Sequence, residues 1–237
     1  MLLLWLLLNA VQGNGCVVSD EFVWSGVGRG QSFLPVRDPA SFCFLTSARA
    51  WNYGSCGLRF DALVSAWALE FAANLDAFQC GARCVSNCSG PVRVTNEARL
   101  RGKGRHEAAL AVANQSVCAF TYGQAWYNDA ERCAIVTRGD YWVLASASEQ
   151  SNFGCGSKCA VFESGISLTQ QVLLTSYGPQ TASLLAVQEG FCFLSQGRSF
   201  FRGKESCQVR LNGPFWELAM DSGQGNFECG AMCVRTS

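Results

Sequence analysis

The sequence of 237 residues lacks the features that mark several large classes of protein. It has one histidine, five prolines and no excess charge, with 18 basic and 18 acidic residues. A protein that binds nucleic acid by neutralising phosphates normally has a basic excess, so nucleic acid is not expected as a partner. Because prolines are few and no low-complexity stretch is present, nothing in the sequence resembles a linker between separate modules.

The groups that catalysis requires are also scarce. The single histidine, His106, has no evident partner, and no Gly-x-Ser-x-Gly elbow or glycine-rich phosphate loop is present. The chain contains a three-fold internal repeat that its cysteines mark, and no pair of acidic residues recurs at matched positions of the three copies. The sequence therefore predicts a protein that is not an enzyme, with no catalytic residues and no cofactor.

Long apolar runs are absent after the amino terminus. Residues 1–8 form a short apolar run, and the small residues Val11 and Gly13 offer a peptidase site after Gly13. The run is too short to span a hydrocarbon core of about 30 Å, so residues 1–13 are predicted to be a secretory signal peptide. An amphiphilic anchor or a truncated gene is the alternative, because no Lys or Arg precedes the run. We expect a secreted, extracellular protein with no membrane span.

Cysteine, in contrast, is abundant: the chain has 14, and twelve of them form three copies of one pattern. The first and fourth cysteines of each copy are 41 residues apart, and a tryptophan lies 24 residues after the first. The cysteines are Cys43, Cys56, Cys80 and Cys84, then Cys118, Cys133, Cys155 and Cys159, then Cys192, Cys207, Cys229 and Cys233; the tryptophans are Trp67, Trp142 and Trp216. This spacing indicates an internal repeat of about 75 residues.

The cysteines are predicted to form disulfides rather than a metal site. The close pairs have C-x-x-x-C spacing, not the C-x-x-C of zinc sites, and His106 lies outside all three clusters. The constant interval between the first and fourth cysteines favours a bond between these two, which leaves the second cysteine to pair with the third. Cys16 and Cys88 bracket the first copy and are predicted to pair, although a bond from one of them to a partner chain is the alternative. The predicted pairs are Cys16–Cys88, Cys43–Cys84, Cys56–Cys80, Cys118–Cys159, Cys133–Cys155, Cys192–Cys233 and Cys207–Cys229.

The position of the second cysteine predicts β-structure. It follows the first by 13 residues in copy one and by 15 in the other two, and the interval to the tryptophan compensates. A shift of two residues keeps a side chain on the same face of a strand, whereas it rotates a helical side chain by about 200°. Alternation around Asn212-Gly213 and around Arg138-Gly139-Asp140 predicts a hairpin in each copy, with a longer loop in copy one and the tryptophan facing a core.

These observations predict an all-β protein of three tandem disulfide-stapled repeats, over residues 14–90, 91–164 and 165–237. Two arrangements fit: three small modules in a row, or three units that share one pseudo-three-fold core. The lack of linkers favours the shared core.

The repeat also offers a candidate glycan site. An aromatic residue lies eight residues after each first cysteine, and a long polar residue lies two before the aromatic. A ring beside a hydrogen-bond donor is a common way to bind a sugar. The alternative is a core ring covered by its polar neighbour. The residues are Arg49 and Trp51, Gln124 and Trp126, and Arg198 and Phe200.

A second candidate is a basic segment that only one repeat contains. Arg99, Arg101, Lys103 and Arg105 occupy alternate positions, so in one strand they would share a face and attract sulfated glycans or anionic surfaces. The alternative is a solvated edge strand whose charges deter aggregation.

Two sequons place candidate glycosylation at Asn87 and Asn114. Taken together, the sequence predicts a secreted, non-catalytic, cysteine-rich protein with an extracellular binding or structural role. Its expected partners are extracellular glycans or another extracellular protein, and its oligomeric state stays open. The alternative is a multivalent carbohydrate-binding protein that uses the three ring-and-donor positions.

Overall fold

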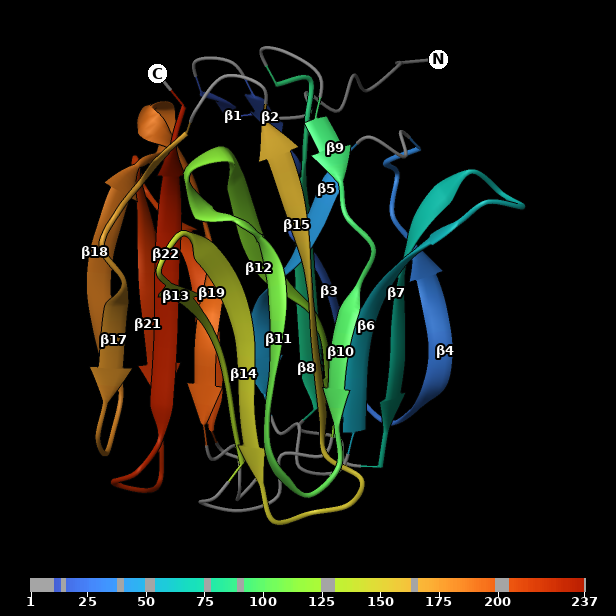
Figure 1. The fold of residues 1–237 in the computed structure, drawn as a ribbon, viewed down its shortest axis with the longest axis vertical. Helices are drawn as coiled ribbons and strands as arrows, with labels where there is room; N and C mark the ends of the chain where they lie inside the picture. Colours follow the sequence, from blue (N-terminus) through green and yellow to red (C-terminus); the bar gives the residue numbers. More distant parts are fainter. Residues whose placement is uncertain are drawn as a thin grey trace, which may run out of the picture.

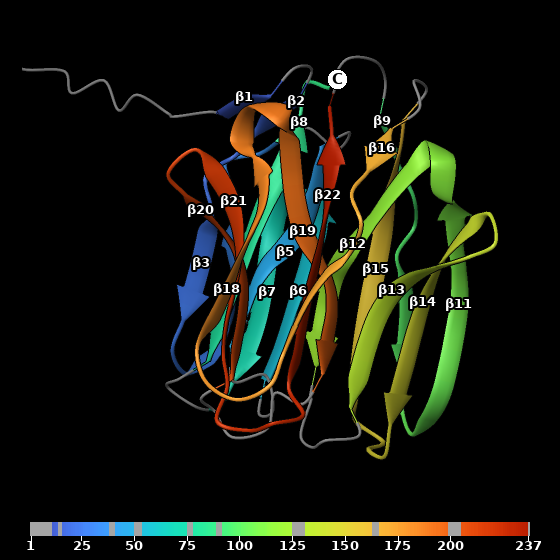
Figure 2. The ribbon, with the colours of Figure 1, turned by 90° about the vertical axis from the view of Figure 1, so that its left-hand side faces the viewer.

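The computed structural model describes residues 11–13, 16–37, 41–49, 54–74, 78–88, 92–124, 131–162, 166–198 and 205–236. These residues form three antiparallel β-sheets and two short 3₁₀ helices, η2 (Ala113–Gln115) and η3 (Val187–Glu189), with no α-helix among them. The two views of the ribbon, turned by 90°, show the strands of all three sheets running along the long axis of the molecule (Figures 1 and 2). The predicted all-β, three-repeat fold is confirmed.

Each sheet is continuous from edge to edge. Sheet A has eight strands: β1 (Val11–Gly13), β2 (Cys16–Val18), β3 (Phe22–Ser25), β5 (Phe42–Arg49), β8 (Gln79–Ser86), β18 (Gln180–Ala186), β20 (Ser206–Asn212) and β21 (Phe215–Asp221). Sheet B has seven: β4 (Gly28–Phe33), β6 (Gly54–Asp61), β7 (Ala66–Ala73), β9 (Val92–Val94), β10 (Ala98–Arg101), β12 (Ser116–Gln124) and β15 (Gly154–Phe162). Sheet C also has seven: β11 (Gly104–Val112), β13 (Arg132–Arg138), β14 (Tyr141–Ser148), β16 (Ser167–Leu168), β17 (Val172–Thr175), β19 (Gly190–Arg198) and β22 (Glu228–Arg235).

Every sheet combines strands from two repeats. The first and fourth cysteines of a repeat lie on paired strands, β5 with β8, β12 with β15 and β19 with β22. The hairpin of the same repeat crosses to a neighbouring sheet, so β6–β7 extends sheet B, β13–β14 extends sheet C and β20–β21 extends sheet A. The repeats therefore exchange hairpins in a closed cycle.

The three sheets share one core. The strands β5, β12 and β19 contact one another, and the buried hydrophobic residues of all three repeats form a single cluster. Trp67, Trp142 and Trp216 are at most 1% exposed, as the repeat pattern predicted. The Phe44 ring lies 5.8 Å from that of Phe191, which joins the first repeat to the third. The repeats thus complete one fold.

The structure joins the seven cysteine pairs expected from the spacing, and the two kinds of pair have different roles. Each outer pair links directly opposed residues of one sheet, with Cα atoms 4.0 Å apart. Each inner pair joins two sheets: Cys56–Cys80 links B to A, Cys133–Cys155 links C to B, and Cys207–Cys229 links A to C. The inner bonds close a covalent ring around the core. The Cys16–Cys88 disulfide joins the two ends of the first repeat to each other.

Loop lengths explain the compensating two-residue shift. The second cysteine lies four residues before the residue that opposes the tryptophan, Phe60, Thr137 or Leu211, in every copy. The hairpin loop has four residues between Asp61 and Ala66 but two in the other copies. The longer loop predicted for copy one therefore accounts for the longer interval to its tryptophan, and the second cysteine lies in a strand in every copy, as expected.

One hairpin turn differs from its prediction by one residue. Asn212 remains in strand β20 opposite Phe215, and the turn consists of Gly213 and Pro214. Asn212 donates a hydrogen bond from Nδ2 to Glu217 at 2.9 Å, which holds it in the strand. Pro214 has no N–H to give to a ladder, so the turn accommodates it without loss. Gly213 supplies the positive φ of 58°.

A bulge recurs in the central strand of each repeat. The register skips Thr46, Thr121 and Ser195, three residues after each first cysteine, and their side chains are fully buried. Each hydroxyl is hydrogen-bonded to a long side chain from the segment before β3, β10 or β17. The partners are Glu21 at 2.7 Å, Glu97 at 2.6 Å and Gln171 at 2.9 Å. A buried hydroxyl outside the ladder needs such a partner, so the bulge and its partner form one repeated unit.

Candidate functional site: an arginine row on sheet C

The three candidate glycan donors end equivalent strands on different sheets. Arg49 ends β5, Gln124 ends β12 and Arg198 ends β19, so the structure separates them onto sheets A, B and C. Their surroundings differ. Gln124 accepts a hydrogen bond from the Tyr122 hydroxyl, and Arg198 pairs with Glu228 at 3.0 Å. The rings expected beside them, Trp51, Trp126 and Phe200, lie outside the described residues.

The basic segment does not form one strand face. Arg99 and Arg101 lie on β10 of sheet B, whereas Arg105 lies on β11 of sheet C, and Lys103 is in the turn between them. Both strands are at sheet edges and all four side chains are exposed. The expectation of one charged face fails because the turn at Gly102, with φ of 87°, passes the chain from one sheet to the next.

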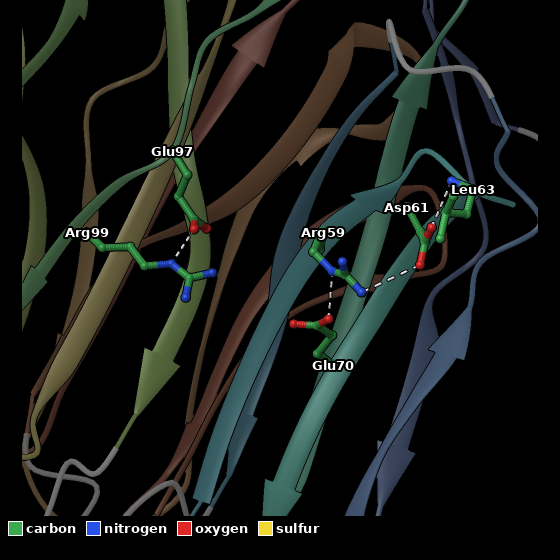
Figure 3. A network of polar contacts seen from close by, with 6 residues as sticks. All are labelled: Arg59, Asp61, Leu63, Glu70, Glu97 and Arg99. Atoms are coloured by element: carbon green, nitrogen blue, oxygen red, sulfur yellow. Dashed lines mark hydrogen bonds and ion pairs between the residues drawn. The ribbon is translucent and has the colours of Figure 1, made fainter. Parts of the chain in front are cut away.

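On sheet B the arginines are already engaged with protein groups. The Arg99 guanidinium lies 4.1 Å from the centre of the Tyr122 ring, and it pairs with Glu97 (Figure 3). The ring is 8% exposed and rests where glycine leaves room, because a Cβ at Gly154 would come within 3.0 Å of it. Burial raises the pKa of the Tyr122 hydroxyl. This face is filled by its own side chains.

The same figure shows a second compact ion-pair group on sheet B. Arg59 donates to Glu70 at 2.7 Å and lies 3.5 Å from Asp61, whose other oxygen accepts from the Leu63 amide (Figure 3). These contacts link β6 and β7 and hold the start of the long hairpin loop. They are partly exposed pairs, so they favour a local geometry more than they stabilise the fold.

Sheet C differs because its arginines form a row across the strands. Arg105 of β11 and Arg132 of β13 both lie opposite Ala147 of β14, and Arg132 lies opposite Arg198 of β19. Arg198 in turn lies opposite Glu228 of β22. Residues that oppose one another across a sheet share a face. Three arginines from two repeats therefore lie in one row on the same face of the sheet, with Ala147 between Arg105 and Arg132.

A groove accompanies this row. Small residues, Ala134, Ala145 and Ala147, line its floor between β11 and β13. It comprises two adjoining depressions of about 390 Å³ and 330 Å³, and Arg105 and Arg132 line both. At the far end Arg138 of β13 pairs with Glu107 of β11, so an ion pair crosses the groove there. The arginine row lies at the end of the groove opposite this ion pair.

The charges of the row are unequally matched. Glu228 lies 3.0 Å from Arg198 and 3.5 Å from Arg132, and its side chain is 15% exposed. One carboxylate thus orients two guanidinium groups. The side chain of Arg105 has no hydrogen-bond or ion-pair partner among the described residues. Glu149 lines the same depression as Arg105 and Arg132. The row therefore retains a positive group that faces open space.

The equivalent rows of the other sheets lack this arrangement. On sheet B the corresponding edge residue is Arg29, which faces Ala72 and then Ser55 in place of a second arginine. On sheet A the row contains Asp221 and Ser206 before Arg49. The arginine row belongs to one face only. Sequence reasoning identified Arg105 and Arg198 but not Arg132, because no local pattern indicates the register that places Arg132 opposite both Ala147 and Arg198.

Other sequence predictions have these places in the structure. Asn87 and Asn114 are both exposed, with Asn87 next to the Cys88 disulfide and Asn114 in η2. His106 contacts the carbonyl of Lys103 at 3.0 Å. The predicted signal peptide lies outside the described residues except for its last three, which form β1 and pair with β2.

Within the described ranges, no group of histidine, cysteine or acidic side chains is arranged to hold a metal ion. The same ranges contain no helix of the length and apolarity that crossing a membrane requires. All 14 cysteines are in disulfides, which is typical of extracellular proteins and of oxidising compartments.

Comparison with known proteins gives no relative, since neither a protein-family model nor a curated protein matches the chain.

Proposed function

We propose that this protein is a secreted, non-catalytic binding protein whose three-sheet fold is a rigid support for contacts on its outer faces. The observation that carries the proposal is the ring of inner disulfides, which ties each sheet to the next. A covalently closed scaffold with seven disulfides suits an oxidising, extracellular setting. Rigid supports favour binding because less conformational freedom is lost when a ligand is bound.

The experiment is expression of the full chain in cultured cells that export disulfide-bonded proteins. We expect the protein in the medium, without residues 1–13, and with no thiol that reacts with maleimide before reduction. Retention inside the cell with reactive thiols would contradict the proposal. A screen of the secreted protein against immobilised glycans and extracellular-matrix proteins then identifies the ligand class.

A second candidate function is multivalent carbohydrate binding at the ring-and-donor positions. It is supported by the placement of Arg49, Gln124 and Arg198 at equivalent strand ends, one on each sheet, which suits a ligand with several arms.

Combined replacement of Trp51, Trp126 and Phe200 by Ala tests this second function on a glycan array. We expect the triple variant to lose glycan binding. Tyr177→Ala is the control, since Tyr177 is an aromatic residue that is 71% exposed outside these positions. Equal binding by both variants and the native protein would exclude the ring-and-donor sites.

A further inference from the structure

We propose that the groove on sheet C binds a sulfated glycan, with one sulfate held between Arg105 and Arg132 above Ala147. This inference deepens the proposed extracellular binding role, because it names the ligand class and the face. Four observations carry it: the spacing of the two arginines, the orientation of Arg132, the free charge of Arg105, and the apolar floor.

The spacing suits a single anionic group. Arg105 and Arg132 lie on either side of Ala147, two strand steps apart, so their Cα atoms are separated by about 10 Å. The alanine between them has no side chain long enough to fill the gap. Two flexible arginines can therefore direct their planar N–H groups at one tetrahedral anion from opposite sides.

One arginine is held in place and the other is available. Glu228 positions Arg132 and Arg198 from the side away from β11. Arg132 remains 47% exposed despite this contact, so its guanidinium keeps donors for a ligand. Arg105 has no side-chain partner among the described residues. No carboxylate of the described residues forms an ion pair with Arg105, although Glu149 and Glu107 line the groove, so its guanidinium is available to a bound anion.

The floor favours a sugar over a bare ion. Ala134, Ala145 and Ala147 line the groove, so the C–H groups of a sugar ring would bury apolar surface there, which a bare ion cannot do. The two depressions together provide space within the range of ligand sites. The Arg138–Glu107 pair limits the groove at its far end. These dimensions suit one or two sugar rings with the sulfate at the arginine row.

The fold provides matched controls for the test. Arg29 occupies on sheet B the edge position that Arg105 occupies on sheet C, and Ala72 corresponds there to Ala147. Arg29 is exposed but has no arginine across from it. A general attraction of sulfated chains to surface arginines would involve Arg29 and Arg105 alike, whereas a built site depends on Arg105.

The experiment is isothermal titration of the full secreted chain with a sulfated heparin tetrasaccharide, its desulfated counterpart and an oligoglutamate peptide. The variants are R105Q, R132Q and A147L, with R29Q and A72L as controls. Melting temperature and the absence of free thiols establish that each variant is folded. We expect R105Q and R132Q each to weaken tetrasaccharide binding roughly tenfold, as loss of a charged hydrogen bond does.

A147L keeps every charge but fills the floor, so we expect it to weaken binding as well. R29Q and A72L should bind within about twofold of the native protein, a change far smaller than the loss of one charged contact. Equal losses for R105Q and R29Q, unchanged binding by A147L, or equal binding of the desulfated sugar or the oligoglutamate peptide would overturn the site. A secreted, fully disulfide-bonded protein that binds neutral glycans but no sulfated one would overturn this inference and leave the proposed function standing.

Discussion

Glu217 shows how one side chain contributes to stability in a way that depends on pH. On the hairpin β20–β21 its carboxylate accepts hydrogen bonds from Asn212 at 2.9 Å and from Arg210 at 2.6 Å and 2.8 Å. The hydrogen bond from Asn212, and next those from Arg210, hold the pKa of this carboxyl below its usual value. The charged form is favoured in the folded protein, so folding and deprotonation of Glu217 are linked.

This linkage predicts the effect of Glu217→Gln. A carboxyl whose pKa is lowered by folding stabilises the native state above its unfolded pKa of about 4.3, and the effect is lost as pH falls through the folded value. We expect Glu217→Gln to melt at a lower temperature than the native protein at pH 7, and the difference between the two melting temperatures to shrink as the pH falls below the unfolded pKa of the carboxyl. Asp140→Asn, at an exposed turn, is the control. A melting-temperature difference that stays constant from pH 7 to pH 3 would contradict the linkage.

The buried hydroxyl of Thr121 leads to a second prediction at the level of single residues. Glu97 accepts its hydrogen bond in the second repeat, whereas in the third repeat a glutamine at the same position, Gln171, donates from Nε2 to the Ser195 hydroxyl. The chain thus contains its own control. We expect Glu97→Gln to be nearly neutral, whereas Glu97→Leu should lower the free energy of unfolding by about 1–3 kcal/mol, because the hydroxyl loses its partner in the core.

Urea unfolding of the two variants measures this difference. Equal destabilisation by Gln and Leu would show that the charge of Glu97, through Arg99 and Lys158, matters more than the hydrogen bond. Burial lowers the pKa of Lys158, whereas the negative charge of Glu97 raises it, so the two side chains attract each other. The ion pair with Arg99 is partly exposed and should contribute little.

Among the elements, the exchanged hairpins carry the inner disulfides. Cys207 of β20 bonds to Cys229 of β22, so a bond of the third repeat joins sheet A to sheet C. Cys192–Cys233, in contrast, links two strands that already share a ladder. The two disulfides of one repeat therefore constrain different motions, although both close loops in the unfolded chain.

We predict different consequences for their removal. Each double replacement by Ala, C207A/C229A or C192A/C233A, should lower the free energy of unfolding by about 2–4 kcal/mol through loop entropy. Only C207A/C229A should also release the hairpin from its neighbour, and amide hydrogen exchange in β20 and β21 should then accelerate. Exchange that is equally fast in both variants would argue against a separate role for the inner bond.

For the whole molecule, the exchange of hairpins means that no repeat completes a sheet. The second repeat places β12 and β15 in sheet B but β13 and β14 in sheet C. Its hairpin pairs with β19 of the third repeat, and its central strand pairs with β6 of the first. A single repeat that is cut from the chain would expose both strand edges and one side of its core.

We therefore expect a fragment of residues 91–164 to lack cooperative unfolding and near-ultraviolet circular dichroism. The full chain should unfold in one transition, because its buried residues form one cluster. Both are measured by thermal scans of the oxidised proteins. A fragment that melts cooperatively with a dispersed NMR spectrum would show that the repeats are independent modules.

Several features of the fold could be predicted because they depend on local spacing. The nested pairing follows from intervals within one repeat, and the buried tryptophans follow from alternation in a hairpin that pairs with itself. The hairpin exchange has no such local signal, because a strand's sequence does not identify which of three similar neighbours it pairs with. The bulge left a trace: Ser19, Thr95 and Thr169 recur two residues before Glu21, Glu97 and Gln171, and their hydroxyls accept from cysteine amides.

The amino-acid sequence by itself determined the repeat, the β-structure and the disulfide framework, since each depends on distances along the chain. Only the tertiary structure decided that the repeats exchange hairpins and that Arg105, Arg132 and Arg198 form one row. The physical reason is that the register of paired strands determines which residues lie next to one another in a sheet. Between strands of different repeats, that register depends on how the shared core packs. Basic residues occupy every second position from Arg99 to Arg105 in the sequence. In the structure, a turn at the sheet edge divides them between sheet B and sheet C.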